Sequence, residues 1–346
     1  MKIAKVGFVG LFLLVLIFLS AQPTSAQTPK LITESFYVPA RDPGIELYVR
    51  NKRPEGVTTF GPEKIVLFVH GAIGPAESTF DLPLDGISWM DYIAQRGYDV
   101  YLMDVRGFGA STRPSEMSRP ANENPPIVNT DVAVRDVGAV VDHILTRRSV
   151  RKINLIGWSW GTAIMAGYTA QNSSKVERLV LYAALWIRET PSRMTGERTS
   201  AYRTVGMDFA QKRWLSSVPK EKQKDFIPPG WFEAYAKALL ATDPIGSTQT
   251  PPVVRVPNGA LEDGTKYWNA GIPYYDPSKI NIPLLLIHAE WDADTPAYMS
   301  QALFGKLVNT PLKRYVVIGE GTHMVIMEKN RMQLFREVQL FLDEPR

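Results

Sequence analysis

Short apolar runs that alternate with amphipathic stretches constrain the fold of this 346-residue chain more than any other feature. Runs rich in β-branched and aromatic residues are predicted to be strands at 34–40, 45–51, 64–70, 98–104, 152–158, 178–184, 283–289 and 314–320. Helical patterns lie between them at 90–96, 130–148, 162–172, 298–307 and 328–342. Strands that are apolar throughout are typical of a parallel sheet buried on both faces. The alternation predicts an α/β fold with a mostly parallel sheet flanked by helices.

The alternation breaks in residues 186–280, a segment rich in proline, glycine and aromatic residues. It contains a helical piece at 230–241 but no strong strand run. We interpret it as an insertion between two strands, forming a lid over one edge of the sheet. The core is then expected to comprise 27–185 and 281–346.

The N-terminus has the layout of a secretory signal. Lys2 and Lys5 precede an apolar run at 6–19, and the small-residue pattern Thr24-Ser25-Ala26 follows. This run is shorter than the ~20 residues that span a bilayer. We predict a signal peptide at 1–26, cleaved after Ala26, so that the mature protein is secreted or periplasmic and has no stable membrane anchor.

Composition excludes several classes of function. The chain has no cysteine, so it can form no disulfide, thiolate nucleophile or lipid-modified anchor. Without the two signal lysines, 37 basic and 35 acidic residues remain. This near balance gives no reason to expect nucleic acid or an anionic membrane as a partner, and favours a small-molecule substrate.

The sequence Gly157-Trp158-Ser159-Trp160-Gly161 follows a predicted strand and opens a predicted helix. A serine on such a sharp turn has a strained backbone, and its Oγ projects from the strand end. Strand and helix pass so closely there that only glycine fits two positions before and after. The alternative role, a helix N-cap, explains neither glycine. We therefore predict that Ser159 is a nucleophile.

A serine nucleophile needs a base, and the chain has four histidines. His143 lies in mid-helix, His70 ends a strand, and His288 lies inside an apolar strand run, where a hydrogen-bonded core histidine is the default. His323 follows the strand run at 314–320, in a loop before the last helix. We predict His323 to be the base.

The base in turn needs a carboxylate to orient it. The loop after the strand at 283–289 offers Asp292 and Asp294. We select Asp292, four residues before Pro296, with Asp294 as the second candidate and Glu189 as the third.

An oxyanion formed during the reaction needs preorganised donors. The backbone N–H of Trp160 is expected to be one donor. The loop 70–74 is expected to supply the second, from the N–H of Ala72 or, alternatively, of Ile73. Trp158, Ile73 and Trp186 are expected to contact substrate. Neither a metal nor an organic cofactor is implied.

Four motifs together resemble the α/β-hydrolase fold superfamily, in its serine esterase and lipase-like branch. They are VHGAIG (69–74), DVRGFGAS (104–111), GWSWG (157–161), and EWDADTP (290–296) paired with GEGTH (319–323). The resemblance implies an eight-stranded sheet, a Ser159–His323–Asp292 triad, an oxyanion hole near Ala72 and Trp160, and a cap after the sixth strand. Ala289 and Thr322 depart from the family pattern, which commonly has glycine at both positions.

These observations predict an exported serine hydrolase that cleaves a carboxylic ester or lactone. The aromatic residues of 186–280 suggest an apolar or aromatic acyl group, although they could equally form the segment's own core. An aminopeptidase resembling proline iminopeptidases is an alternative, but Trp158 stands where those enzymes usually have glycine. Cofactor-free perhydrolase or haloperoxidase chemistry is a second alternative, and a non-catalytic binding protein is a third. The physiological substrate and oligomeric state stay open.

Overall fold

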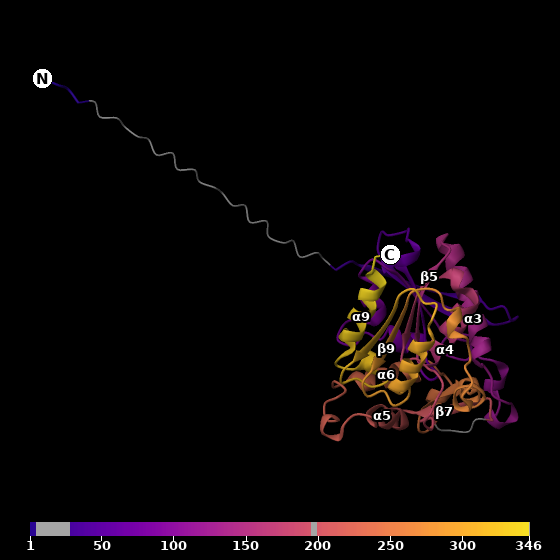
Figure 1. The fold of residues 1–346 in the computed structure, drawn as a ribbon. Helices are drawn as coiled ribbons and strands as arrows, with labels where there is room; N and C mark the ends of the chain where they lie inside the picture. Colours follow the sequence, from indigo (N-terminus) through magenta and orange to yellow (C-terminus); the bar gives the residue numbers. More distant parts are fainter. Residues whose placement is uncertain (5–27, 195–198, 346) are drawn as a thin grey trace.

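A single eight-stranded sheet forms the centre of the molecule (Figure 1). The computed structural model describes residues 1–4, 28–194 and 199–345. The strand β2 is antiparallel to both of its neighbours, and all other pairs of adjacent strands in this sheet are parallel. The sheet is therefore mostly parallel, as predicted. Its strands, in spatial order, are β1 (Leu31–Pro39), β2 (Glu46–Pro54), β4 (Asp99–Met103), β3 (Ile65–Val69), β5 (Ile153–Trp158), β6 (Val176–Tyr182), β9 (Leu284–Ala289) and β10 (Lys313–Ile318).

Helices cover both faces of this sheet (Figure 1). One face carries α2 (Trp89–Ala94) and α9 (Arg331–Asp343), joined by stacking of Trp89 on Phe335 with ring centroids 5.1 Å apart. The other face carries α3 (Thr130–Arg148) and α4 (Trp160–Asn172), which pack against each other. The helix α8 (Ala297–Lys306) packs beside β9 and β10. Burial of both faces explains why β3 is apolar along its whole length and why every residue of β5 is buried.

Local signals fix the helix ends. The Asn129 side chain accepts a hydrogen bond from the Val132 N–H and caps α3, whose last turn carries Arg147 and Arg148. This helix has the predicted bounds. The last helix begins at Arg331, and not at Glu328 as expected. Glu328 has an extended backbone, and its buried carboxylate accepts hydrogen bonds from the Trp214 side chain and the Thr322 N–H.

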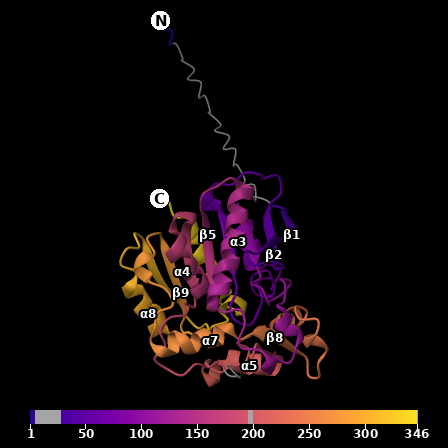
Figure 2. The same ribbon diagram turned by 90° about the vertical axis from the view of Figure 1, so that its right-hand side faces the viewer.

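The segment 186–280 leaves the sheet after β6 and returns at β9. We call it the inserted segment. Both views place it across one end of the sheet (Figures 1 and 2). Its elements are β7 (Tyr202–Gly206), α5 (Met207–Leu215), α6 (Trp231–Leu240), β8 (Val253–Pro257) and α7 (Gly259–Lys266).

Two short strands in the inserted segment correct the sequence analysis, which expected none. β7 and β8 pair in antiparallel register. Arg203 and Arg255 interrupt their apolar patterns, which hid them. Both arginines are nevertheless buried, because their guanidinium groups bond neighbouring carbonyl or carboxylate groups.

The predicted signal peptide lies, apart from residues 1–4, outside the described residues, as does its cleavage point. Within the part of the chain that the structure describes, no helix combines the length and apolar character needed to cross a bilayer.

Glycine is required where β5 turns into α4. A Cβ atom at Gly157 would lie 2.3 Å from the carbonyl oxygen of Gly161, and one at Gly161 would lie 2.5 Å from that of Val69. Both obstacles are backbone atoms, which cannot rotate away.

We expect Gly161→Ala to lower the free energy of unfolding by about 2–3 kcal/mol, because the added methyl group overpacks the strand–helix contact. Urea denaturation of the purified chain measures this. Gly305→Ala in α8 is the matched control, since no atom lies within 4 Å of its added Cβ. Equal stability of the two variants would contradict the proposed steric constraint.

Candidate active site

Ser159 lies at the turn between β5 and α4 with an unusual backbone. Its φ of 56° and ψ of −120° belong to a region that side chains other than glycine rarely adopt. The Ser159 N–H donates to the Tyr182 carbonyl at 3.0 Å, and its own carbonyl accepts from the Thr162 N–H. The Ser159 hydroxyl makes no helix-capping bond. The strained turn is therefore held by backbone bonds and leaves Oγ free to face a partner.

The structure brings together the three side chains that the sequence analysis selected. His323 Nε2 lies 2.9 Å from Ser159 Oγ, and His323 Nδ1 lies 2.8 Å from Asp292 Oδ2. His323 is 5% and Asp292 4% exposed, so water is largely excluded from this line of hydrogen bonds. The serine comes from the end of β5, the aspartate from the loop after β9 and the histidine from the loop after β10.

Asp292 is held in its ionised form. Burial acts to raise its pKa, but the interaction with His323 and the hydrogen bonds it accepts outweigh burial and hold the pKa at about 2. Besides His323, the carboxylate accepts from the N–H groups of Asp294 and Thr295, both at 2.9 Å, and from the Thr295 hydroxyl at 2.8 Å. A fixed carboxylate of this kind sets the tautomer of the imidazole.

The backbone of His323 is anchored by two aromatic side chains. The Tyr182 hydroxyl donates to its carbonyl at 2.7 Å and the Trp158 Nε1–H does so at 3.2 Å. The Trp158 ring also lies beside the imidazole, with centroids 5.4 Å apart. Trp158, next to the serine in sequence, thus fixes the histidine in space.

The loop 70–74 lies against the serine. A Cβ atom at Gly71 would come within 3.1 Å of Ser159 Cβ. His70 is buried, which lowers its pKa to about 4 and keeps the ring neutral. Its Nδ1–H donates to the Gly71 carbonyl at 2.7 Å, while its Nε2 accepts from the Val105 N–H at 3.1 Å. In a trans peptide the N–H points opposite to the carbonyl, so His70 also orients the Ala72 N–H.

A second buried donor holds the next peptide of this loop. Arg203 of β7 donates to the Ala72 carbonyl at 2.9 Å, and also to the Pro257 carbonyl and the Asn258 side chain. Among the described residues the Arg203 guanidinium bonds no carboxylate, and burial lowers its pKa to about 9. Sequence analysis missed Arg203, because nothing in the sequence shows that an arginine of the inserted segment reaches this loop.

A cavity that is open to solvent lies beside Ser159 and His323. Its lining includes Trp158, Ile73, Ala72 and Trp160, the residues expected to contact substrate or stabilise an oxyanion. Its wall also includes aromatic side chains of the inserted segment, namely Trp214, Tyr235 and Trp268.

Trp186 is not among the residues that line this cavity, so its expected contact with substrate stays a prediction. Its ring packs edge-on against Tyr275, with centroids 5.3 Å apart, and is 6% exposed. The aromatic residues of the inserted segment thus divide between its own packing and the cavity wall.

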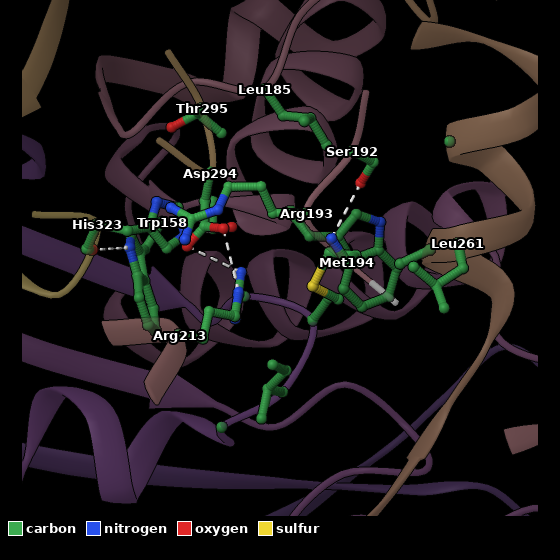
Figure 3. A pocket seen from close by; sticks show the side chains of 18 of the residues that line it. Trp158, Leu185, Ser192, Arg193, Met194, Arg213, Leu261, Asp294, Thr295 and His323 are labelled. Carbon is green, nitrogen blue, oxygen red and sulfur yellow. Dashed lines mark hydrogen bonds and ion pairs between the residues drawn. The ribbon is translucent and has the colours of Figure 1, made fainter. Parts of the chain in front are cut away.

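The second candidate acid, Asp294, is engaged elsewhere. Its Oδ1 accepts from Arg213 Nε at 3.1 Å and its Oδ2 lies 3.0 Å from Arg213 Nη2 (Figure 3). This two-point ion pair joins α5 to the loop that carries Asp292. The third candidate, Glu189, is exposed, and its backbone N–H bonds the Tyr298 hydroxyl.

Glu328 is a buried carboxylate behind His323 that sequence analysis missed. It accepts from Trp214 Nε1 of α5 at 2.7 Å, from the Thr322 N–H at 3.0 Å and from the Thr322 hydroxyl. Burial raises its pKa to about 7. Thr322 stands where family members commonly have glycine, and its hydroxyl is used here to bind this carboxylate.

Within the described residues, no other histidine is hydrogen-bonded to Ser159. His143 packs against Phe36, with ring centroids 5.3 Å apart. His288 is buried, but neither ring nitrogen has a hydrogen-bond partner within the described residues, so it is not the satisfied core histidine that was expected.

One cluster within the described chain has the composition of a metal site. Ligand atoms of Asp292, Asp294 and His323 lie within 4.8 Å of one another. Those side chains already bond one another, Thr295 and Arg213, which accounts for the cluster without an ion.

The sequence of residues 64–330 matches the family model described as alpha/beta hydrolase fold. Because the match spans most of the chain, the protein belongs to the α/β hydrolase fold family, and its class is that of a hydrolase. The N-terminal β1 and β2 lie outside the matched residues.

A curated relative from Synechocystis sp., named "Putative non-heme chloroperoxidase", is 23% identical over 279 residues, or 74% of this chain and 86% of that protein. Among solved structures, a bromoperoxidase from Bacillus anthracis superposes with a TM-score of 0.62 at 17% identity, covering 90% of this chain and 100% of that one. A thermophilic esterase from Thermogutta terrifontis superposes with a TM-score of 0.60 at 16% identity, covering 89% of this chain and 98% of that one. At these identities the structural likeness shows the fold alone.

The raised pKa of Glu328 predicts a specific pH dependence of stability. The pKa of Glu328 is higher in the folded than in the unfolded chain, so its protonated form stabilises the fold. This contribution to the free energy of unfolding is fully present below about pH 4.5 and is lost as the pH rises through about 7. Relative to Glu328→Gln, the free energy of unfolding of the wild type should fall by about 2 kcal/mol between pH 5 and pH 8.

Urea denaturation at the two pH values measures this difference. Glu233→Gln, a change at an exposed carboxylate on α6, is the control and should follow the wild type. A pH-independent difference between the wild type and Glu328→Gln would show that Glu328 ionises alike in both states.

Proposed function

We propose that this protein is an exported serine hydrolase that cleaves a carboxylic ester or lactone through an acyl-enzyme. The observation that carries the proposal is the unbroken line of hydrogen bonds from Ser159 Oγ through His323 to Asp292. Export rests on the sequence of residues 1–26 alone.

In this mechanism His323 Nε2 takes the proton of Ser159 as Oγ attacks the substrate carbonyl. Asp292 stabilises the imidazolium that forms. The oxyanion is stabilised by the N–H groups of Trp160, at the first turn of α4, and of Ala72, whose peptide is oriented by His70. The imidazolium returns its proton to the leaving alcohol, and a water molecule activated by His323 then hydrolyses the acyl-enzyme.

The cavity wall supports an apolar or aromatic acyl group. Trp158, Trp214 and Trp268 present rings beside the serine, and apolar surface of this kind favours apolar ligands. The inserted segment acts as a lid in this proposal, since it supplies much of that wall.

Perhydrolase chemistry is the second candidate function, because a relative named as a chloroperoxidase and a structure named as a bromoperoxidase share the fold. Hydrogen peroxide would replace water in attacking the acyl-enzyme, releasing a peracid and regenerating the serine. Acetate- and peroxide-dependent halogenation by the purified protein distinguishes this reaction from ester hydrolysis. Hydrolysis of aminoacyl anilides would instead identify an aminopeptidase.

Ser159→Ala is expected to abolish labelling by a fluorophosphonate probe and to lower kcat for a 4-nitrophenyl ester by about 10⁴-fold or more, because it removes the nucleophile. Gel fluorescence measures the labelling, and the absorbance of the released 4-nitrophenolate measures the hydrolysis. Ser115→Ala, at an exposed serine outside the cavity, controls for the loss of a hydroxyl. Labelling that persists in Ser159→Ala would locate the nucleophile elsewhere.

Asp292→Asn and Asp294→Asn separate the two candidate acids. Asn at 292 favours the wrong imidazole tautomer, so kcat should fall by about 10⁴-fold. Asn at 294 weakens only the ion pair with Arg213, and kcat should fall by about tenfold or less. Steady-state kinetics, with thermal melting to verify folding, measures both. A larger loss from Asp294→Asn would reverse the assignment.

A further inference from the structure

The cavity beside Ser159 carries more positive than negative charge. Its lining includes the guanidinium groups of Arg188, Arg193 and Arg213, and the carboxylate of Asp294. Asp294 and Arg213 neutralise each other in the two-point ion pair. Arg193 donates to the Ser216 hydroxyl, a neutral partner.

Arg188 is the least compensated of these groups. Its Nη2 donates to the backbone carbonyl of Asp294. Its Nη1 is buried and has no hydrogen-bond partner among the described residues. A buried N–H group of a charged side chain without an acceptor is costly, and a ligand that accepts from it relieves that cost.

The surroundings of Arg188 agree with an anionic ligand. Burial is the main reason that the pKa of Arg188 is lowered, and the nearby Arg213 lowers it further. Asp294 and Asp292 act in the opposite direction. The guanidinium nevertheless stays protonated, as arginine does in proteins. The bond to Asp294 places Arg188 beside the loop of Asp292, within the same cavity as Ser159. Arg203, which bonds no carboxylate among the described residues, adds positive potential behind the loop 70–74.

We propose that Arg188 forms an anion-binding subsite that receives a carboxylate carried by the substrate. This inference rests on the proposed esterase function and narrows its substrate class to esters or lactones that also contain a free acid. The planar guanidinium matches the two oxygens of a carboxylate. A phosphate dianion would need more donors than this one group offers within a mainly apolar wall.

The test uses pairs of esters that differ only in charge. Mono-4-nitrophenyl succinate, glutarate and adipate are each compared with the 4-nitrophenyl ester of the corresponding methyl half-ester. For each pair, the charge preference is the kcat/KM of the acid divided by that of its methyl ester. The wild type should prefer the acid by about tenfold or more in at least one pair, as one charge-assisted hydrogen bond implies.

Arg188→Gln should lower this charge preference by about tenfold, and Arg188→Lys should retain part of it, because lysine keeps the charge but not the planar fork. Arg135→Gln, at an exposed arginine of α3 paired with Asp42, is the matched control and should keep the wild-type preference. If Arg188 only supported the Asp294 loop, Arg188→Gln would slow both esters equally and leave the ratio unchanged. Such a result would overturn the subsite.

Wild-type cleavage of the methyl esters without any preference for the acids would also overturn the subsite, while leaving the esterase proposal intact. A binding measurement decides the subsite even if no ester is cleaved. Adipate added to Ser159→Ala should change the fluorescence of the tryptophans that line the cavity, and Arg188→Gln in that background should weaken this binding about tenfold or more. Equal binding by both proteins would contradict the proposal.

Discussion

The contact between the end of β5 and the start of α4 is the constraint on which the rest of the site depends. Gly157 and Gly161 let two backbones approach so closely that a Cβ atom at either position would overlap a carbonyl group. This approach forces Ser159 into its strained conformation and turns its Oγ toward the loop of His323. The bonds from the Ser159 N–H to Tyr182 and from the Tyr182 hydroxyl to His323 then tie the same turn to the partner loop. Backbone packing, and not the hydroxyl itself, fixes where the chemistry can take place.

The sequence was sufficient for the parts of the structure that repeat a simple pattern. The buried strands are mostly apolar. The helix α3 begins after an Asn cap and ends in basic residues, so its bounds were predicted to the residue. Ser159, His323 and Asp292 could be selected because each follows a strand whose carboxyl end meets the same edge of the sheet. Ser159 was selected by its flanking glycines, His323 from a short list of histidines and Asp292 by its position before Pro296.

What could not be predicted depends on contacts between distant segments. Arg188, Arg203 and Glu328 have ordinary sequence neighbours, and their importance becomes visible only where the inserted segment packs on the core. The strands β7 and β8 were missed for the same reason, since their buried arginines are tolerated only because acceptors from other segments surround them. Trp186 was expected to contact substrate as one of the aromatic residues of the inserted segment, but the sequence does not show that its ring packs against Tyr275.

The bond from Arg203 of β7 to the Ala72 carbonyl makes the inserted segment part of the scaffold that shapes the loop beside the serine. An exchange of the inserted segment that omitted this arginine would also release a peptide group next to Ser159. Evolutionary replacement or engineering of the inserted segment in this chain therefore has to conserve one buried guanidinium, whatever happens to the residues that face the ligand.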